Sequence, residues 1–249
     1  MALLEEFEQQ GIWLFRYRSS IPLFILIIGA GLFFYTKYYS PDAFFYYSFR
    51  MQYELLCVLV SLFGLIIRIY TVGHTPKNTS GRNTKTQVAE TLNSSGIYSI
   101  VRHPLYLGNF FMWLGPAMIT GNLWFCIAFC LFYWIYYERI MFAEEQFLRN
   151  KFGDTYLNWS KDVPAFIPKM KNFRKSELPF NWKKIMIKEK NGLAAIFIIF
   201  TFMDVVGEMI SGSQAYNYIL IYLCTASILY YLLMRFLRSY TKFFQSVYK

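Results

Sequence analysis

A short polar and aromatic stretch, Gly96 to Gly108, lies where a polar part of the chain meets a long apolar one. Its sequence is GIYSIVRHPLYLG, and Arg102 and His103 stand directly before a proline. Pro104 suits the first turn of a helix, where its missing N–H costs nothing. The free N–H groups of that turn, together with Arg102 and His103, would bind a carboxylate or a phosphate. The stretch therefore predicts an anion site, and the alternative is a flanking charge beside a helix cap.

A pair of acidic residues, Glu144 and Glu145, follows on the polar continuation of a later apolar segment. That segment is expected to form a hairpin with the helix that begins at Pro104, so the two motifs should meet. Adjacent carboxylates can bind ribose hydroxyls or an amino group. The alternative for Glu145 is an ion pair with Arg149, one helical turn later. Glu144 has Leu148 at the equivalent position and is the stronger candidate.

The two motifs together predict a site for a zwitterionic cofactor. Anion donors would form one wall and carboxylates the other, with Tyr98 and Tyr106 between them. S-adenosyl-L-methionine fits this pattern, because it carries a carboxylate, an amine, a ribose and a sulfonium that tyrosine rings can face.

The elements that position these residues are expected to be membrane-spanning helices. Of the 249 residues, 56% are apolar and 16% charged, whereas about a quarter of the residues of a soluble domain carry charge. Apolar segments long enough to cross a bilayer recur along the chain, which predicts an all-α integral membrane protein. An interfacial helix within residues 1–20 would precede about six transmembrane helices, at residues 21–39, 51–72, 104–120, 123–140, 192–211 and 218–236.

The charge distribution predicts how the chain lies in the membrane. The formal net charge is +10, with 25 Lys and Arg, and these basic residues cluster beside apolar segments, as the positive-inside rule describes. This pattern argues against nucleic acid as a partner. Only Lys37 and Arg50 are expected at outer ends of spans. Both termini and the cofactor pocket are therefore predicted on the cytoplasmic side.

The chain divides into three predicted regions by composition. Residues 1–72 hold the interfacial helix and two spans, residues 73–168 hold the motifs and two spans, and residues 169–249 hold a basic interfacial segment and two spans. The basic segment is either a solvated linker or a lipid contact. Cys126 and Cys130 lie one helical turn apart without a histidine or an acid beside them, so they are interpreted as packing residues and no metal is predicted.

The ordered set of motifs resembles the isoprenylcysteine carboxyl methyltransferase and phospholipid methyltransferase superfamily. The shared pattern is Gly-x-Tyr, Arg-His-Pro-x-Tyr-x-Gly, Glu-Glu-x-x-Leu, Phe-Gly-x-x-Tyr and Val-Pro, over about residues 82–168. This resemblance implies a membrane-embedded methyltransferase that uses S-adenosyl-L-methionine. It also implies a cytoplasmic cofactor pocket and a lipid or lipid-linked acceptor that enters from the bilayer.

The resemblance also implies roles for individual residues. Those that match cofactor-contacting positions are Tyr98, His103, Pro104, Leu105, Tyr106 and Glu144, while Glu90, Thr91, Leu92 and Asn93 match the loop that closes over the cofactor. Arg102 and Glu145 complete the predicted cofactor set from the motifs themselves. Prenylcysteine-specific members of the family place a substrate-binding arginine four residues before the cofactor glutamate. That position is Ile140 here, and the adjacent Arg139 is the predicted acceptor contact.

A further acidic pair, Asp204 and Glu208, lies within the span at residues 192–211. Acids inside a membrane usually face a cavity or a partner, so Asp204 is predicted to line a polar cavity for the substrate. Two other functions are considered: an NADPH-dependent sterol-reductase-like enzyme, and a non-catalytic lipid-binding or transport protein. Pro104 and Leu105 depart from the reductase pattern. No catalytic base is predicted, and the sequence carries no signal of an oligomeric state.

Overall fold

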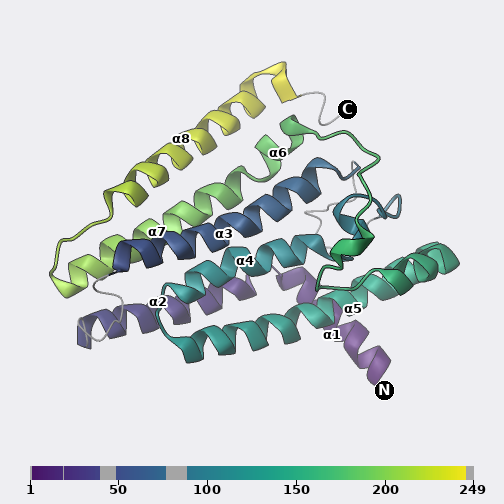
Figure 1. Cartoon of the computed structure of the whole chain (residues 1–249), viewed down its shortest axis with the longest axis horizontal. Coiled ribbons are helices and arrows are strands. Elements are labelled where there is room, and N and C mark those ends of the chain that lie inside the picture. The colour runs from purple at the N-terminus through teal and green to yellow at the C-terminus, as the bar shows by residue number, and fades with distance from the viewer. Residues whose placement is uncertain (1, 19, 40–48, 77–88, 245–249) are drawn as a thin grey trace.

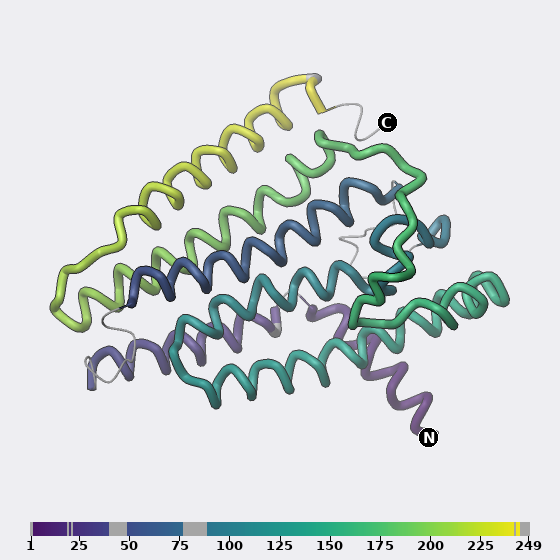
Figure 2. The backbone as a smooth tube through the Cα atoms, viewed as in Figure 1, coloured from purple at the N-terminus to yellow at the C-terminus, as the bar shows by residue number. Residues whose placement is uncertain are grey.

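The computed structural model describes residues 2–18, 20–39, 49–76 and 89–244. Regular structure among them is helical, apart from one isolated bridge between Gly96 and Arg174. Figures 1 and 2 show the arrangement of these helices. The α-helices are α1 (Leu3–Tyr17), α2 (Ile21–Tyr39), α3 (Arg50–Gly73), α4 (Pro104–Met118), α5 (Leu123–Asp162), α6 (Trp182–Lys188), α7 (Lys190–Ser211) and α8 (Tyr218–Tyr240), and the 3-10 helices are η1 (Ile97–Ser99), η2 (Met170–Asn172) and η3 (Lys242–Phe244).

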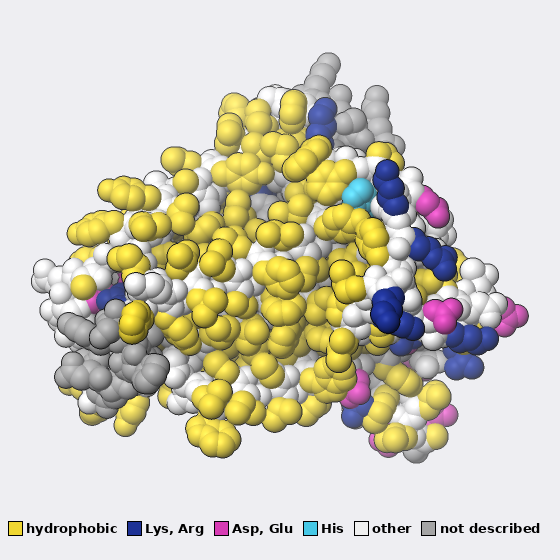
Figure 3. Space-filling model, viewed as in Figure 1, with side chains coloured by type: hydrophobic (Ala, Val, Ile, Leu, Met, Phe, Trp, Pro, Cys, Tyr) yellow, Lys and Arg dark blue, Asp and Glu magenta, His cyan; other side chains and the backbone are white. Residues whose placement is uncertain are grey.

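The predicted all-α integral membrane fold is confirmed. Five helices, α2, α3, α5, α7 and α8, are long and apolar enough to cross a membrane. The remaining predicted span forms α4, which has 15 residues and is therefore about 22 Å long. The hydrocarbon core of a bilayer is about 30 Å thick, so α4 is shorter than a full crossing. Figure 3 shows apolar side chains over the middle of one face and charged side chains gathered at one end.

The interior of the bundle is built on close contact between α3 and α4, the most extensive helix pair in the described residues. A Cβ atom at Gly64 would lie 2.3 Å from the carbonyl oxygen of Gly108 and 2.6 Å from the backbone nitrogen of Met112. Farther along the pair, the Ser61 hydroxyl donates a hydrogen bond to the Met112 carbonyl, at 3.0 Å. Only glycine at position 64 allows the two backbones to approach this closely.

Replacing Gly64 with alanine is therefore expected to destabilise the protein by about 1–3 kcal/mol, the usual cost of overpacking a well-packed core. The neighbouring atoms are backbone atoms of α4 and cannot turn away. Gly31→Ala in α2 is the matched control, because its added Cβ meets no atom within 4 Å among the described residues. Thermal unfolding in detergent measures both variants. Equal melting temperatures for the two would contradict this account of the α3–α4 contact.

Ion pairs join α3 to the start of α7 at the end of α3 that lies beside the beginning of α4. The guanidinium of Arg68 donates to both carboxylate oxygens of Glu189, each at 2.8 Å. It also donates to the side-chain oxygen of Asn109 in α4, at 2.6 Å. One side chain therefore links three helices.

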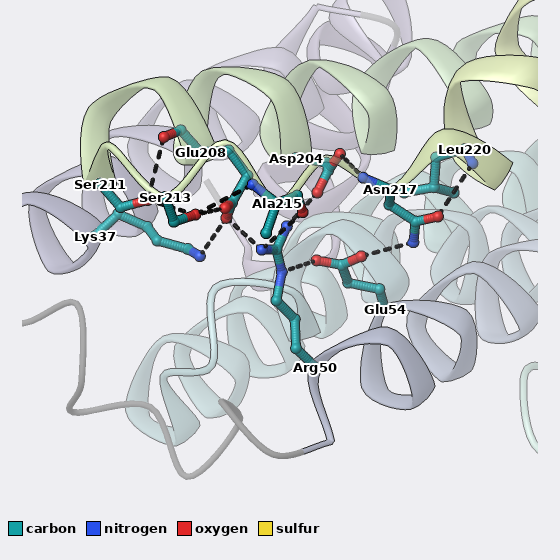
Figure 4. Close-up of polar contacts among 10 residues, drawn as sticks. All are labelled: Lys37, Arg50, Glu54, Asp204, Glu208, Ser211, Ser213, Ala215, Asn217 and Leu220. Carbon is teal, nitrogen blue, oxygen red and sulfur yellow. Dashed lines mark hydrogen bonds and ion pairs between the residues drawn. The ribbon is translucent and has the colours of Figure 1, made fainter.

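A larger buried cluster joins the other ends of α3 and α7 (Figure 4). We call it the Arg50 network. Its members are Lys37, Arg50, Glu54, Asp204, Glu208, Ser213 and Asn217. The Arg50 guanidinium pairs with Glu54, at 2.8 Å, and with Asp204 and Glu208. Lys37 donates to Glu208 at 3.0 Å. The two basic residues expected at outer ends are thus neutralised by carboxylates.

Asp204 is held on both sides within this network. Its carboxylate pairs with Arg50 and accepts a hydrogen bond from the backbone N–H of Asn217, at 2.9 Å. The side-chain amide of Asn217 in turn donates to Glu54, also at 2.9 Å. Only 1% of Asp204 is exposed. Asp204 therefore faces partners in an ion-pair network, and its predicted place in a polar cavity for the substrate stays a prediction.

The two ends of the described chain lie at the same end of the bundle (Figure 1). α1 packs against α5, and the C-terminal ends of α5 and α8 lie on that side as well. The Arg50 network lies at the opposite end. The charged side chains in Figure 3 gather mainly at the end that carries the termini.

Candidate active site

The start of α4 fixes the position of His103. Pro104 is the first helical residue, and His103 directly precedes it with a non-helical backbone. The carbonyl of His103 accepts hydrogen bonds from the N–H groups of Tyr106 and Leu107, each at 3.1 Å. Its side chain is buried, with 7% of the residue exposed. The predicted helix start at Pro104 is confirmed, and the imidazole is held at the helix entrance.

The hairpin of α4 and α5 brings the acidic motif to this entrance. Asn122 caps α5 through its side-chain oxygen, which accepts from the N–H of Phe125. α5 then continues as a helix beyond the predicted span and carries Glu144 and Glu145 back to His103. Nε2 of His103 lies 2.9 Å from Glu145, and Nδ1 lies 3.5 Å from Glu144.

Two more side chains complete this group. Arg102 pairs with Glu145 at 3.1 Å, and the hydroxyl of Tyr106 donates to Glu144 at 2.7 Å. We call the group the His103 cluster. Its members are these five residues, Arg102, His103, Tyr106, Glu144 and Glu145, together with Tyr98, whose hydroxyl lies within electrostatic reach of Glu144. Sequence analysis predicted all six, but placed donors and carboxylates on facing walls, whereas in the structure they contact each other directly.

The charges of the two carboxylates act on the titratable groups that face them. Burial alone would lower the pKa of His103, but its hydrogen bonds to Glu144 and Glu145 and their charges outweigh burial and raise that pKa. Burial and the charge of Glu144 raise the pKa of the Tyr98 hydroxyl, which therefore stays protonated. The two carboxylates therefore favour the protonated form of His103.

The raised pKa of His103 predicts a pH dependence of stability. In the unfolded chain the pKa of His103 returns to its ordinary value of 6.5. The stability that His103 contributes to the folded protein is therefore fully present below pH 6.5. The contribution is lost as the pH rises through the higher folded pKa. We expect the melting temperature of the wild type to fall over this range more than that of His103→Gln. If the melting temperatures of the wild type and His103→Gln change equally between pH 6 and pH 9, His103 is not charged in the folded protein.

A break in α5 folds its last part over the cluster. Gly153 has a φ of +51°, in the left-handed region, and the helix resumes after it. Trp159 then donates from its indole nitrogen to the carbonyl of Tyr98, at 3.2 Å, and Tyr156 is buried. Sequence analysis did not include these two aromatic residues in the site. The Phe-Gly-x-x-Tyr motif contains Tyr156 and was the available signal.

The chain after α5 runs back along the residues that carry the cluster. The backbone N–H groups of Arg102 and His103 donate to the carbonyls of Pro164 and Ala165, at 2.9 and 3.2 Å. The N–H of Lys169 donates to the carbonyl of Ile100, at 2.9 Å. The predicted return segment therefore fixes the backbone of the cluster as well as covering it.

The other predicted site residues lie elsewhere. The guanidinium of Arg139 stacks on the ring of Phe7 in α1, with 3.3 Å to the ring centroid. Asp204 belongs to the Arg50 network, at the opposite end of α3 from the His103 cluster. Leu105 is half-buried on the first turn of α4.

The segment from Glu90 to Asn93 precedes η1. Glu90 and Thr91 are exposed, and Leu92 and Asn93 are half-buried. Their predicted contact with a cofactor stays a prediction. Residues 77–88 of the same predicted loop lie outside the described residues.

Arg18, at the end of α1, is a basic residue that sequence analysis did not connect with the site. Its guanidinium lies over the ring of Phe15, with 3.8 Å to the centroid. It is also within electrostatic reach of the hydroxyls of Tyr106, Tyr136 and Tyr137. Nothing in the sequence of α1 places it there, because the contact depends on how α1 crosses α5.

Comparison with known proteins matches the segment that carries the cluster. The family model described as phospholipid methyltransferase matches residues 53–155. A protein-S-isoprenylcysteine O-methyltransferase of Schizosaccharomyces pombe is 42% identical over 78 residues, which are 31% of this chain and 33% of that protein. One from Xenopus laevis is 31% identical over 124 residues, 49% of this chain and 42% of that protein.

A third relative carries a different name. The cobalt-zinc-cadmium resistance protein CzcN of Cupriavidus metallidurans is 32% identical over 84 residues, 34% of this chain and 38% of that protein. The chain thus spans between about a third and two fifths of the length of these relatives. No solved structure matches. The resemblance predicted from the motifs is confirmed over residues 53–155, which contain the whole His103 cluster, and the reductase and transport alternatives are not favoured.

Proposed function

We propose, from the match of residues 53–155 to the family model described as phospholipid methyltransferase, that the protein is a membrane-embedded methyltransferase. It uses S-adenosyl-L-methionine and acts on a lipid or lipid-linked acceptor. The observation that carries the proposal is the His103 cluster, in which Arg102 and His103 meet two carboxylates inside the matched segment. When bound, S-adenosyl-L-methionine would supply a methyl group on a sulfonium sulfur, and that sulfur would leave as a neutral thioether when the methyl group is transferred.

The residues of the cluster fit a zwitterion. Arg102 and His103 would bind its carboxylate, and Glu144 and Glu145 its amine or ribose hydroxyls. Nε of Arg102 is buried and makes no hydrogen bond within the described residues, so this donor is available for an oxygen of a ligand. Because the cluster places two basic side chains beside two carboxylates, a zwitterion could pair its carboxylate with the first and its amine with the second.

The remaining predicted residues complete the proposed site. Tyr98 and Tyr106 would face the sulfonium through their rings. Pro104 and Leu105 would form its apolar wall, and the segment from Glu90 to Asn93 would cover it. The chain's contribution to catalysis is alignment of the acceptor with the methyl group and exclusion of water. A carboxylate acceptor needs no proton transfer, whereas an amine acceptor would first have to lose a proton.

The acceptor is proposed to be a lipid or a lipid-linked group. The relatives named isoprenylcysteine O-methyltransferase support a lipid-linked acceptor. Arg139 stacks on Phe7, and we do not include it in the proposed acceptor site. We likewise assign Asp204 a structural role in the Arg50 network.

The orientation in the membrane is also part of the proposal. The His103 cluster and both described ends of the chain lie at one end of the bundle, and the charged side chains on the face drawn in Figure 3 gather mainly at that end (Figures 1 and 3). Because basic residues are enriched on the cytoplasmic side, we place this end in the cytoplasm. Lys37 and Arg50 then lie on the outer side, where their carboxylate partners neutralise them.

Membranes containing the protein, incubated with S-adenosyl-L-methionine labelled in its methyl group, test the proposed function. We expect label in the lipid-extractable fraction, and none with membranes that lack the protein. Mild alkali then separates acceptors, because a carboxyl methyl ester releases volatile methanol whereas an N-methyl group stays on the lipid. Absence of label from both the lipid fraction and lipid-modified proteins would refute the function.

A further inference from the structure

We propose that residues 174–184, which we call the brace, are a positioning element that sets the place of residues 89–99 beside the His103 cluster. The brace lies beyond the matched segment 53–155, in the region that leads to α6 and α7. Its effect on cofactor binding rests on the proposed function, whereas its effect on the position of residues 89–99 does not.

One end of the brace is bonded to the chain on the C-terminal side of residues 89–94. The N–H of Gly96 donates to the carbonyl of Arg174 at 3.0 Å. The N–H of Arg174 donates in turn to the hydroxyl of Ser99, at 2.8 Å. The N–H of Glu177 donates to the hydroxyl of Ser95, at 3.3 Å. Three hydrogen bonds therefore fix the segment that runs directly into Tyr98 and the cluster.

The other end of the brace is bonded to residues 73–76, at the end of α3. The N–H of Asn181 donates to the carbonyl of Gly73, at 2.9 Å. Nδ1 of His74 lies 2.8 Å from the carbonyl oxygen of Leu178, and the rings of His74 and Phe180 are in contact, with centroids 5.1 Å apart. The brace thus ties two parts of the chain that are some twenty residues apart to one short segment.

Lys184 provides the strongest of these contacts. Its ammonium group donates to the carbonyl and hydroxyl oxygens of Thr75, at 2.8 and 3.0 Å, and to the carbonyl of Pro76, at 3.2 Å. Only 6% of the residue is exposed. Burial, with the nearby charge of Lys188, lowers the pKa of Lys184 to about 8. Three ammonium hydrogens therefore meet three neutral acceptors, and the charge is held without a carboxylate at these contacts.

The contacts of α6 connect the brace to the two C-terminal spans, α7 and α8. α6 begins within the brace at Trp182 and packs against α3, α7 and α8. Ion pairs at both ends of α7 hold α7 along α3. The two C-terminal spans therefore hold the brace, and the brace holds the approach to the cofactor site. This gives α7 and α8 a role in a reaction that takes place between α4 and α5.

Hydrogen–deuterium exchange on the full-length protein in detergent tests the brace, with Lys184→Met compared with Lys183→Met. Lys183 is the neighbouring lysine of the same helix and is exposed. We expect amides of residues 89–99 to exchange about tenfold faster in Lys184→Met, the effect of losing a hydrogen bond from a charged donor. Residues 104–118 should exchange as in the wild type, and Lys183→Met should change neither region.

A second variant approaches the brace from its other end. Ser99→Ala removes the acceptor for Arg174 and should speed exchange over the same residues. Unchanged exchange at residues 89–99 in both Lys184→Met and Ser99→Ala would overturn the proposal. Faster exchange throughout α3, α4 and α5 would also overturn it, because that result means general unfolding.

Affinity for S-adenosyl-L-methionine, measured on the same samples, separates the two proposals. We expect Lys184→Met to bind about tenfold more weakly than Lys183→Met, because residues 90–93 are less well placed. If the wild type does not bind the cofactor, the proposed function fails while the exchange result still decides on the brace.

Discussion

Glu144→Gln is expected to weaken binding of S-adenosyl-L-methionine by about thirtyfold or more. The Glu144 carboxylate accepts from Tyr106 and faces the buried imidazole of His103, while 24% of its own side chain is exposed. Removing one partner of a buried, hydrogen-bonded charge pair costs about 2–5 kcal/mol, and about 1.4 kcal/mol corresponds to a factor of ten in affinity. The amide keeps the shape of the side chain but cannot pair with the amine of the cofactor. Isothermal titration calorimetry on purified protein measures the effect.

Glu138→Gln is the matched control for this variant. Glu138 lies on the same helix, six residues earlier, and is exposed. The Glu138→Gln variant should bind the cofactor with the same affinity as the wild type. Glu144→Gln with wild-type affinity and an unchanged melting temperature would remove Glu144 from the site, and equal losses in the two variants would indicate a general effect of charge on α5.

Arg50→Met is expected to cause the largest loss of stability, about 3–5 kcal/mol. Removing one partner of a buried ion pair leaves its counterions uncompensated. Here the network would hold three carboxylates, on Glu54, Asp204 and Glu208, and only one of its two cations, Lys37, would remain. A loss of this size lowers the melting temperature of a chain of this length by on the order of 10 °C. Thermal unfolding in detergent measures it.

Two further variants show whether the charge of Arg50 is responsible. Arg235→Met, on the exposed face of α8, should leave the melting temperature within a degree or two of the wild type. Adding Asp204→Asn and Glu208→Gln to Arg50→Met should recover part of the loss, because the uncompensated charges are then removed. If the triple variant is less stable than Arg50→Met alone, hydrogen bonding in the network matters more than its charge balance.

The sequence predicted the helices well, because the lengths of the apolar segments and the Gly, Pro and polar residues between them determine where helices begin and end. The span predicted at residues 21–39 is α2, and Pro104 starts α4 as expected. α4 ends at Met118 rather than at residue 120, since Gly121 turns with a positive φ. The continuation of α5 beyond the membrane was also predicted, but not its resumption after Gly153, which only the backbone conformation at that residue reveals.

The site was predicted in its membership but not in its contacts. The short turn predicted at Gly121 and Asn122 implies a hairpin, so the meeting of His103 with Glu144 and Glu145 could be inferred. In the structure residues 119–122 connect α4 and α5. The pairing of Glu145 with Arg102 and His103, rather than with Arg149, depends on how the two helices rotate about their axes. Sequence periodicity leaves that rotation open for helices that are apolar on most sides.

The Arg50 network was not predicted, although Asp204, Glu208, Lys37 and Arg50 were each noticed. Arg50 and Asp204 are 154 residues apart, and no local rule pairs residues at such a distance. The available signal was the presence of intramembrane acids in the same chain as two basic residues, Lys37 and Arg50, that were expected on the outer side. Counting both sets together would have suggested that they neutralise each other.

Photo-crosslinking tests the central claim, that the His103 cluster holds the cofactor, most directly. Purified protein is irradiated with radiolabelled S-adenosyl-L-methionine, and the labelled peptides are identified by mass spectrometry. The account predicts label on peptides that contain Tyr98, His103 or Tyr106, competed by unlabelled cofactor and lost in Glu144→Gln. Saturable label that maps to the Arg50 network or to α8, and that persists in Glu144→Gln, would contradict it.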